Sequence, residues 1–411
     1  MRFLASIAWR NLWRQKRRSL ITAGGMAVGM TLCMALIALM DGMFADMFRV
    51  MVEQQLGHVQ VHNPEYPGKR VMYDTIEDAS AVVASLDALD GTVAVAPRAF
   101  GAALLGGEAG STGVQLQGIE PERESALSSL SERLVHGTWL ANEPDHGIVL
   151  GYRLAEKLHV DVGDSLVAVT QATDGSMGNE IYDVVGLIQT GAAQLDRTGA
   201  LIHLADLQEL LLLGDQVHEI TLLGADDSRE GIAALATDIQ ARTPDALVQT
   251  WWQTSPPTDQ MLSLRDSVSF LVLGAAFLVA AFGVFNTMMM SVLERTRELG
   301  VLRAIGLRPG RLIAMVLFES IFLGVIATAM GLVLGGLADA WMVVYGIDLS
   351  GYMESGFAYN GVVLEPIFYG HVRPGGILLT VAAVFITSVV AALLPAWRAS
   401  RLEPVVALRH D

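Results

Sequence analysis

Cysteine is almost absent from this chain of 411 residues, since Cys33 is the only one. A single cysteine excludes an intrachain disulfide framework and any metal site built from several cysteines. Basic residues are also few: 27 lysines and arginines stand against 43 aspartates and glutamates, which gives a formal net charge of −16. A nucleic-acid-binding protein needs a basic surface to neutralise phosphates, so we expect no nucleic-acid partner.

The sequence also lacks the common catalytic motifs. It contains no G-x-x-x-x-G-K-[ST] phosphate loop, no H-E-x-x-H zinc motif and no G-x-S-x-G nucleophile motif. His58 and His62 are four residues apart, but in a strand this spacing is about 13 Å, too far for one metal ion. We therefore expect these histidines to make hydrogen bonds at the surface or at a sheet edge. We expect no catalysis, no cofactor and no metal site in this chain alone.

Charged residues make up only 17% of the chain, and hydrophobic residues make up 52%. Soluble domains are typically about 25% charged. A simple membrane bundle, on the other hand, would not carry 43 acidic residues. The apolar and the acidic residues must therefore lie in different parts of the chain.

Four segments hold most of the apolar residues. Residues 19–40, 267–293 and 374–397 contain no charged residue, and residues 312–338 contain one. Each segment reaches the roughly 20 residues that a helix needs to cross a bilayer, where no loop or open sheet can replace a helix. The sequence predicts a membrane protein with one transmembrane helix followed, after a large insertion, by three more. We place these helices at residues 19–43, 266–293, 312–345 and 374–397.

The first span could be mistaken for a signal peptide, because the basic segment 1–18 precedes it. Its 22 uncharged residues exceed the apolar core of about 7–15 residues that signal peptides have, and no small-x-small cleavage site follows. We predict that this span is retained as a membrane anchor.

Short basic segments beside the spans indicate the orientation. Residues 1–18 carry six basic residues and no acidic one. The loop 294–311 carries five basic and two acidic residues, and the tail 398–411 carries three basic and two acidic residues. Short basic segments stay in the cytoplasm. We therefore expect both termini and the 294–311 loop inside. The region 44–265, with 12 basic and 32 acidic residues, and the loop 346–373 should lie outside, in the periplasm.

The region 44–265 has the patterns of a folded α+β domain. Strand–helix–strand patterns occur near both of its ends, at residues 58–62, 76–89 and 93–96, and again at 217–223, 228–241 and 247–251. We infer one α+β subdomain built from both ends of the region. The middle should be mostly β, with strands at 147–150, 165–170, 180–189 and 200–203 and helices at 152–158 and 205–213.

Residues 41–56 and 258–266 are predicted to extend the first two membrane helices as a paired stalk. Apolar side chains recur on it at helical spacing: Met43, Phe44, Met47, Phe48 and Met51 on the first helix, and Met261 and Leu264 on the second. Two interpretations are open. The stripe packs the stalk helices together, or it lines a path for a lipid or acyl chain, since methionine suits adaptable apolar surfaces.

Glu319 is the one acidic residue that we expect inside a membrane helix, near its cytoplasmic end. A carboxylate there is a functional candidate by default, so it has either a structural role or a role as a proton relay. Two glycine pairs, Gly25 with Gly29 and Gly331 with Gly335, allow close helix approach but indicate a dimer contact only weakly.

The loop between the second and third spans has the most specific pattern, L-E-R-T-R-E-L-G-V-L-R-A-I-G-L-R at residues 293–308. It is charged on one side and apolar on the other, as an interfacial helix is. The segment either anchors the chain at the membrane surface or docks into a groove of another protein. Its closely spaced Glu/Arg pairs favour docking.

This loop resembles the E-R-T-R-E-I/L-G…R-A-I/V-G motif of FtsX-like ABC permeases, the superfamily of the lipoprotein-releasing (Lol-type) and macrolide-exporter (MacB-type) membrane subunits. The tail L-P-A-W-R-A-S-R-L-E-P-V-V-A-L-R at residues 394–409 and the start A-W-R-N-L at residues 8–12 are also similar to that family. Two features favour the lipoprotein-releasing branch: L-G-H-V-Q-V-H at residues 56–62 and the long 346–373 loop.

The resemblance implies a non-catalytic permease of the bacterial inner membrane, paired with a second permease chain, identical or different, and with a separate ATPase dimer that binds ATP and Mg²⁺. ATP-driven motion would reach the periplasmic domain and extract lipoproteins from the membrane. The residues implied to contact the ATPase are Glu294, Arg295, Arg297, Glu298 and Arg303.

Two alternatives remain open within the same superfamily. A MacB-like exporter would act through a periplasmic adaptor, and an FtsX-type signalling permease would control a hydrolase through its outer domain. The domain of about 220 residues is large for the signalling role.

Overall fold

A computed structural model describes residues 2–14, 16–66, 71–107, 110–348, 357–359, 362–364 and 367–401. The chain forms two compact units. We call residues 1–45, 263–352 and 367–411 the membrane unit, and residues 46–262 and 353–366 the α+β unit. Each unit is described by itself.

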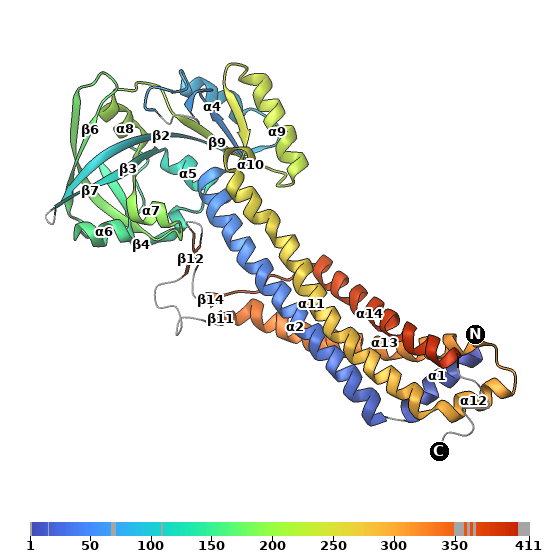
Figure 1. Ribbon diagram of the computed structural model, residues 1–411. Helices are drawn as coiled ribbons and strands as arrows, with labels where there is room; N and C mark the ends of the chain where they lie inside the picture. The colour runs from blue at the N-terminus through green and yellow to red at the C-terminus, as the bar shows by residue number, and fades with distance from the viewer. Residues whose placement is uncertain are drawn as a thin grey trace. The chain divides into compact units, whose positions relative to one another are not determined.

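The membrane unit is built from long apolar helices (Figure 1). Four helices are long and apolar enough to cross a membrane, counted over the described residues. They confirm the predicted fold class of four transmembrane helices with a large α+β insertion after the first. Their bounds are Lys16–Phe48 (α2), Pro256–Glu294 (α11), Pro309–Tyr345 (α13) and Pro374–Ser400 (α14), and the shorter helices are Arg2–Arg14 (α1) and Thr296–Ala304 (α12).

Glycine allows two of these helices to pack closely. A methyl group added at Gly331 or Gly335 of α13 would come within 2.6 Å of the Sδ atoms of Met30 or Met34 on α2. This glycine pair therefore faces a helix of its own chain. The other pair differs, because among the described residues no heavy atom lies within 4 Å of a methyl group added at Gly25.

The prediction that Glu319 is the one acidic residue in a membrane helix is wrong. Asp41 lies within α2 and Asp339 within α13, and both are buried. Asp41 is compensated, because the Arg265 side chain donates to it at 2.8 Å and Arg373 lies 4.0 Å away. Asp41 and Asp339 each stand directly after the last residue of a predicted apolar run, 19–40 or 312–338, so the runs themselves did not include them.

The segment before α14 is held against α2. The N–H of His371 donates to the carbonyl of Ala38 at 2.8 Å, and Gly42 provides the space for the backbone of Tyr369. The short strands of the predicted 346–373 loop pair as two antiparallel ladders: Ile347–Asp348 (β11) with Ile367–Phe368 (β14), and Phe357–Tyr359 (β12) with Val362–Leu364 (β13).

The two ends of the α+β unit form one layered subdomain. Four strands lie in the order β10-β1-β9-β2, with bounds Leu247–Thr250, Val59–His62, Glu219–Gly224 and Thr92–Gly107. Helices α4 (Ala79–Asp87) and α9 (Arg229–Arg242) contact each other and supply apolar side chains to the core beneath these strands (Figure 1). The α+β subdomain predicted from both ends of the region is therefore present.

Strand alternation divides the side chains of this sheet into two faces. Val59 and Val61 of β1 pair in register with Leu222 and Ile220 of β9, and all four belong to the apolar core. Successive residues of a strand point to opposite faces. The opposite face therefore carries the polar members of the same strands: Gln60, His62, Arg98, Glu219 and Thr221.

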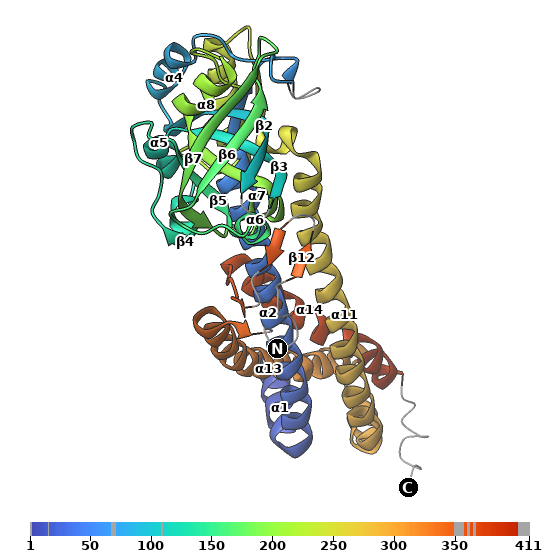
Figure 2. The same cartoon turned by 90° about the vertical axis from the view of Figure 1, so that its left-hand side faces the viewer.

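The middle of the unit is a closed ring of six strands. β2 pairs with β3, β3 with β8, β8 with β5, β5 with β7, β7 with β6, and β6 with β2. Figure 2 shows β7, β6, β2 and β3 side by side in this order. The bounds are Gly110–Ile119 (β3), Gly147–Gly151 (β5), Ser165–Gln171 (β6), Met177–Ile188 (β7) and Gly199–His203 (β8), and β4, Leu134–Gly137, pairs with β7. β2 belongs both to the α+β subdomain and to the ring of six strands. The two parts of the unit that the sequence predicted therefore share one sheet.

Short helices complete the unit. They are α5 (Pro121–Leu127), α6 (Tyr152–Leu158), α7 (Ala193–Thr198), α8 (Leu204–Leu211), α10 (Trp251–Thr254) and the 3₁₀ turn Ser131–Arg133. The segment that follows α2 is a π-helix, Arg49–Leu56 (η1), in which the N–H of Gly57 donates to the carbonyl of Val52 at 2.7 Å. π-Helices are rare and occur mostly as single-turn bulges, so one of eight residues is unusual.

A glycine-to-alanine pair on α2 tests the packing of the membrane unit. Gly42→Ala should destabilise the protein by about 1–3 kcal/mol, because the added methyl group overlaps the carbonyl oxygen of Tyr369. Gly25→Ala on the same helix should be neutral or slightly stabilising, since its surroundings are open. Thermal unfolding of the full chain in lipid nanodiscs measures both, and equal midpoints for the two variants would contradict this packing.

Candidate functional site

The loop between α11 and α13 forms the short helix α12. Leu299 is buried in the apolar core of the membrane unit, so one side of the helix is fixed. The helix ends at a left-handed glycine, Gly306, with φ +98°. The N–H groups of Gly306 and Leu307 donate at 3.0 Å to carbonyls of the last turn, the usual arrangement at a glycine C-terminus.

Two acidic residues that are predicted to contact the ATPase form ion pairs within the chain. Glu294 pairs with Arg18 at 2.7 Å, and Glu298 pairs with Arg14 at 2.9 Å. Partial burial acts to raise the pKa of Glu298, but hydrogen bonds and charges from Arg295 and Arg14 outweigh it and hold the pKa below its ordinary value. These carboxylates therefore tie the loop to α1 and to the start of α2.

Arg295 extends this network to α13. Its guanidinium lies 3.1 Å from Glu298 and 3.5 Å from Glu319. The pair with Arg295 gives Glu319 a structural role in joining the α11–α12 junction to α13. It favours the structural interpretation of Glu319 over the proton relay.

Three of the exposed side chains at α12 follow one another at a spacing of four residues. Arg297 and Val301 are exposed, and Ile305, just after the helix, is 80% exposed. Their spacing of four residues places them on one face, which we call the α12 face. Arg303, the remaining predicted contact, is half-buried, and its Nε has no hydrogen-bond partner among the described residues. The α12 face offers one cation and two apolar side chains to a partner.

The apolar stripe predicted on the stalk is divided between the units. In the α+β unit, Met47 and Met261 are buried, and Phe48 packs against the apolar core. These three side chains serve packing there. The path for an acyl chain stays a prediction for the members in the membrane unit: Met43 and Phe44, which are half-buried, and Leu264, which is 54% exposed.

A buried arginine organises the polar face of the α+β sheet. Arg98 of β2 is 2% exposed and donates from Nε and Nη2 to both carboxylate oxygens of Glu124 on α5, at 3.0 and 2.7 Å. Its Nη1 donates to the carbonyl of Gln55 on η1 at 2.6 Å and lies 3.3 Å from Glu219 on β9. Sequence reasoning missed this cluster, because a lone arginine in a strand gives no signal of its partners.

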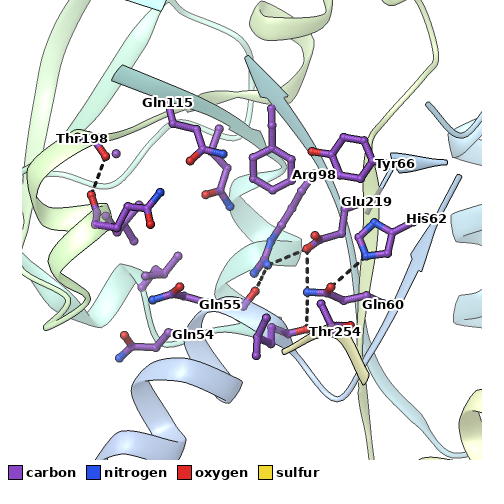
Figure 3. Close-up of a pocket in the computed structure, with 17 residues that line it drawn as sticks. Gln54, Gln55, Gln60, His62, Tyr66, Arg98, Gln115, Thr198, Glu219 and Thr254 are labelled. Carbon is purple, nitrogen blue, oxygen red and sulfur yellow. Dashed lines mark hydrogen bonds and ion pairs between the residues drawn. The ribbon is translucent and has the colours of Figure 1, made fainter. Parts of the chain in front are cut away.

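A cavity of about 230 Å³ opens beside Arg98 (Figure 3). It is lined from β1, β2, β3, β9, α7 and the end of η1, all within the α+β unit. Glutamine is the commonest residue in its wall. Figure 3 shows the labelled glutamines around the cavity beside Arg98 and Glu219.

His58, just before β1, and His62, its last residue, make hydrogen bonds as predicted, but the predicted surface or edge position is wrong, because both are buried and β1 pairs with strands on both sides. His58 accepts from the N–H of Gly224 at 3.2 Å, and His62 bonds the amide oxygen of Gln60 at 3.0 Å. Burial lowers the pKa of His58 and that of His218. Among the described residues, no cluster of His, Cys, Asp and Glu could hold a metal ion.

Two family models match the chain. The MacB-like periplasmic core domain matches residues 19–242, and the FtsX-like permease C-terminal model matches residues 270–404. The matches confirm the resemblance read from the loop, the tail and the layout of the spans. The chain is a membrane permease subunit, and it belongs to the MacB-like and FtsX-like family of ABC transporter permeases.

Characterised relatives match it along its length. The lipoprotein-releasing system transmembrane protein LolC of Xylella fastidiosa is 28% identical over 97% of both chains. LolC of Neisseria meningitidis is 26% identical over 96% of this chain and 94% of its own. The macrolide export ATP-binding/permease protein MacB of Hyphomonas neptunium is 26% identical over 98% of this chain but only 60% of its own length.

Substitution of the buried arginine tests its role. Arg98→Met should destabilise the protein by about 3–5 kcal/mol, because it leaves Glu124 buried without a counter-charge. The matched control is Arg123→Met, which removes ion pairs to Asp87 and Glu120 on the surface and should cost at most about 1 kcal/mol. Thermal unfolding of the full chain in nanodiscs measures both, and equal losses would refute this role.

Proposed function

We propose that this chain is the permease subunit of an ABC transporter that extracts lipoproteins from the bacterial inner membrane. The observation that carries the proposal is the match to LolC proteins over 97% of both chains. The match to the MacB relative leaves 40% of that protein without a counterpart, since the chain spans 60% of it. The lipoprotein-releasing function is therefore preferred to the MacB-like alternative.

The proposal includes partners and an orientation. A separate ATPase dimer binds ATP and Mg²⁺, and a second permease chain, identical or different, completes the assembly. Both termini and α12 lie in the cytoplasm, and the α+β unit lies in the periplasm. The short basic segments beside the spans support this orientation.

The structure supports two different roles for the predicted ATPase contacts: docking by exposed side chains and connection of helices by ion pairs. The α12 face is the docking surface, because Arg297 and Ile305 are exposed. Glu298 of α12 pairs with Arg14 of α1, and Arg295, just before α12, pairs with Glu319 of α13. Glu294, at the end of α11, pairs with Arg18 of α2. Movement of α12 by the ATPase is thereby passed to these helices.

Substitution on the α12 face tests the docking surface. Arg297→Glu and Ile305→Asp should each weaken binding of the ATPase roughly fivefold, the equivalent of about 1 kcal/mol, because they place a negative charge where the partner meets a cation or an apolar side chain. Co-purification and ATPase measurements with the assembled complex show the effect.

The control for this test is Arg153→Glu, which makes the same charge change on the exposed side of α6 in the α+β unit. It should leave ATPase binding and coupling at the level of the unsubstituted chain. If Arg297→Glu and Ile305→Asp bind the ATPase as tightly as Arg153→Glu does, α12 is not the docking surface.

Depletion of the chain in its own cells tests the function. Lipoproteins destined for the outer membrane should then accumulate in the inner membrane, which membrane fractionation and immunoblotting detect. Unchanged lipoprotein distribution would reject the proposal. Capture of a periplasmic adaptor or of a cell-wall hydrolase by the chain, with unchanged lipoproteins, would favour the exporter or the signalling alternative.

A further inference from the structure

The cavity beside Arg98 is walled by amide groups. Six glutamines from η1, β1, β3 and α7 line it: Gln54, Gln55, Gln60, Gln115, Gln117 and Gln194. Each amide has an oxygen that accepts and an NH₂ group that donates hydrogen bonds. A wall of this kind suits a ligand that offers both donors and acceptors around its edge, and nothing in the proposed transport function uses it.

The wall carries no net charge. Of the described residues that line the cavity, Arg98 and Glu219 are the ones with full charges, and they lie 3.3 Å apart. Arg98 also makes a two-point pair with Glu124, which does not line the cavity, so one cation stands against two carboxylates and an anion is disfavoured. The Oε1 atom of Glu219 already accepts from three donors, on Arg98, Gln60 and Thr221, so it is not left free for a cation. The chemistry therefore favours an uncharged ligand.

One amide has unused hydrogen-bonding capacity. Gln54 of η1 is 1% exposed, and its Oε1 has no hydrogen-bond partner among the described residues. Its Nε2 donates to Ser129 at 3.3 Å. A buried unpaired acceptor costs free energy unless a ligand or an ordered water supplies the missing donor. Gln54 is one of the residues that line the cavity.

Apolar surfaces alternate with these amides. Phe100 follows Arg98 on the same side of β2, and Tyr66 stacks against His62 with ring centroids 5.7 Å apart. Both aromatic rings line the cavity, together with Leu56, Leu130 and Leu195. A sugar ring has this same division, since its flat faces carry C–H groups and its edge carries hydroxyl groups.

The geometry excludes a bound polypeptide strand. β1 pairs with both β10 and β9, and β3 pairs with both β2 and β8, so these lining strands have no free edge for strand addition. The volume of about 230 Å³ lies below the range of about 300–1,000 Å³ that holds drug-sized ligands. The occupant must be small and must be recognised by side chains.

We propose that this cavity binds a small uncharged polyhydroxylated molecule, of the size of one sugar ring. Gln115 and Gln117 alternate on β3 and present their amides on the same side, and Gln54 and Gln55 are presented by the π-helix. The π-helix follows α2 without a break in the chain. A ligand in the cavity would therefore contact η1, the segment that connects the first membrane helix to the α+β unit.

Titration with N-acetylglucosamine, followed by saturation-transfer NMR, tests the site in the full chain. The protein is held in lipid nanodiscs, because glucoside and maltoside detergents present the same chemistry as the ligand. Saturable binding is expected, weakened about fivefold to tenfold in Gln117→Leu, which removes one amide's hydrogen bonds. The control Gln189→Leu removes an exposed glutamine outside the cavity and should bind as the unsubstituted chain does.

Two further probes separate the alternatives. N-acetylglucosamine 6-phosphate should bind no better than the neutral sugar, and the neutral peptide N-acetyl-Gly-Gly-amide should not compete with it. Absence of saturable sugar binding, equal binding by Gln117→Leu, or preference for the phosphate or the peptide would overturn the proposal. Each of these binding measurements is independent of lipoprotein release. A failure of the sugar-site proposal can therefore be told apart from a failure of the proposed transport function.

Discussion

The guanidinium of Arg98 is the contact on which the architecture of the α+β unit depends. It joins β2, α5, β9 and the end of η1 at one buried point, through Glu124, Glu219 and the carbonyl of Gln55. A buried cation is tolerated only when its charge and its donors are satisfied, and here two carboxylates and a backbone carbonyl satisfy them. The arrangement also fixes where the π-helix ends and thereby places Gln54 and Gln55 at the cavity.

The membrane unit does not depend on a central buried ion pair. Its helices make their backbone hydrogen bonds internally and need only pack closely against one another. Specific polar contacts are concentrated near the ends of its helices. At one end Asp41 pairs with Arg265, and at the other Glu298 and Glu294 pair with Arg14 and Arg18. Ion pairs at both ends and an apolar middle suit helices that move as rigid bodies, as the proposed coupling to an ATPase requires.

The sequence predicted well the helices and strands that have a local pattern. It predicted poorly the contacts between residues that lie far apart in the chain. Apolar runs of more than 20 residues, three of them without a charge, revealed the four spans. Local alternation revealed β1, and the helical pattern revealed α6 and α9. It missed β3, whose glycines and glutamines weaken the alternation, and it stopped β2 at Ala96 because Pro97 follows. The pairing of Arg14 with Glu298, 284 residues apart, has no local signal at all. The cavity was missed for the same reason, since its glutamines come from separate elements.

The central claim is that ATP hydrolysis on a partner drives this chain to release lipoproteins. The direct measurement reconstitutes the chain with its ATPase, and with the second permease chain if one is required, in liposomes that contain a fluorescent lipoprotein. The account predicts that ATP, but not a non-hydrolysable analogue, transfers the lipoprotein to a soluble acceptor, and that transfer stops when this chain is omitted. Transfer that is independent of ATP or of this chain would contradict the account.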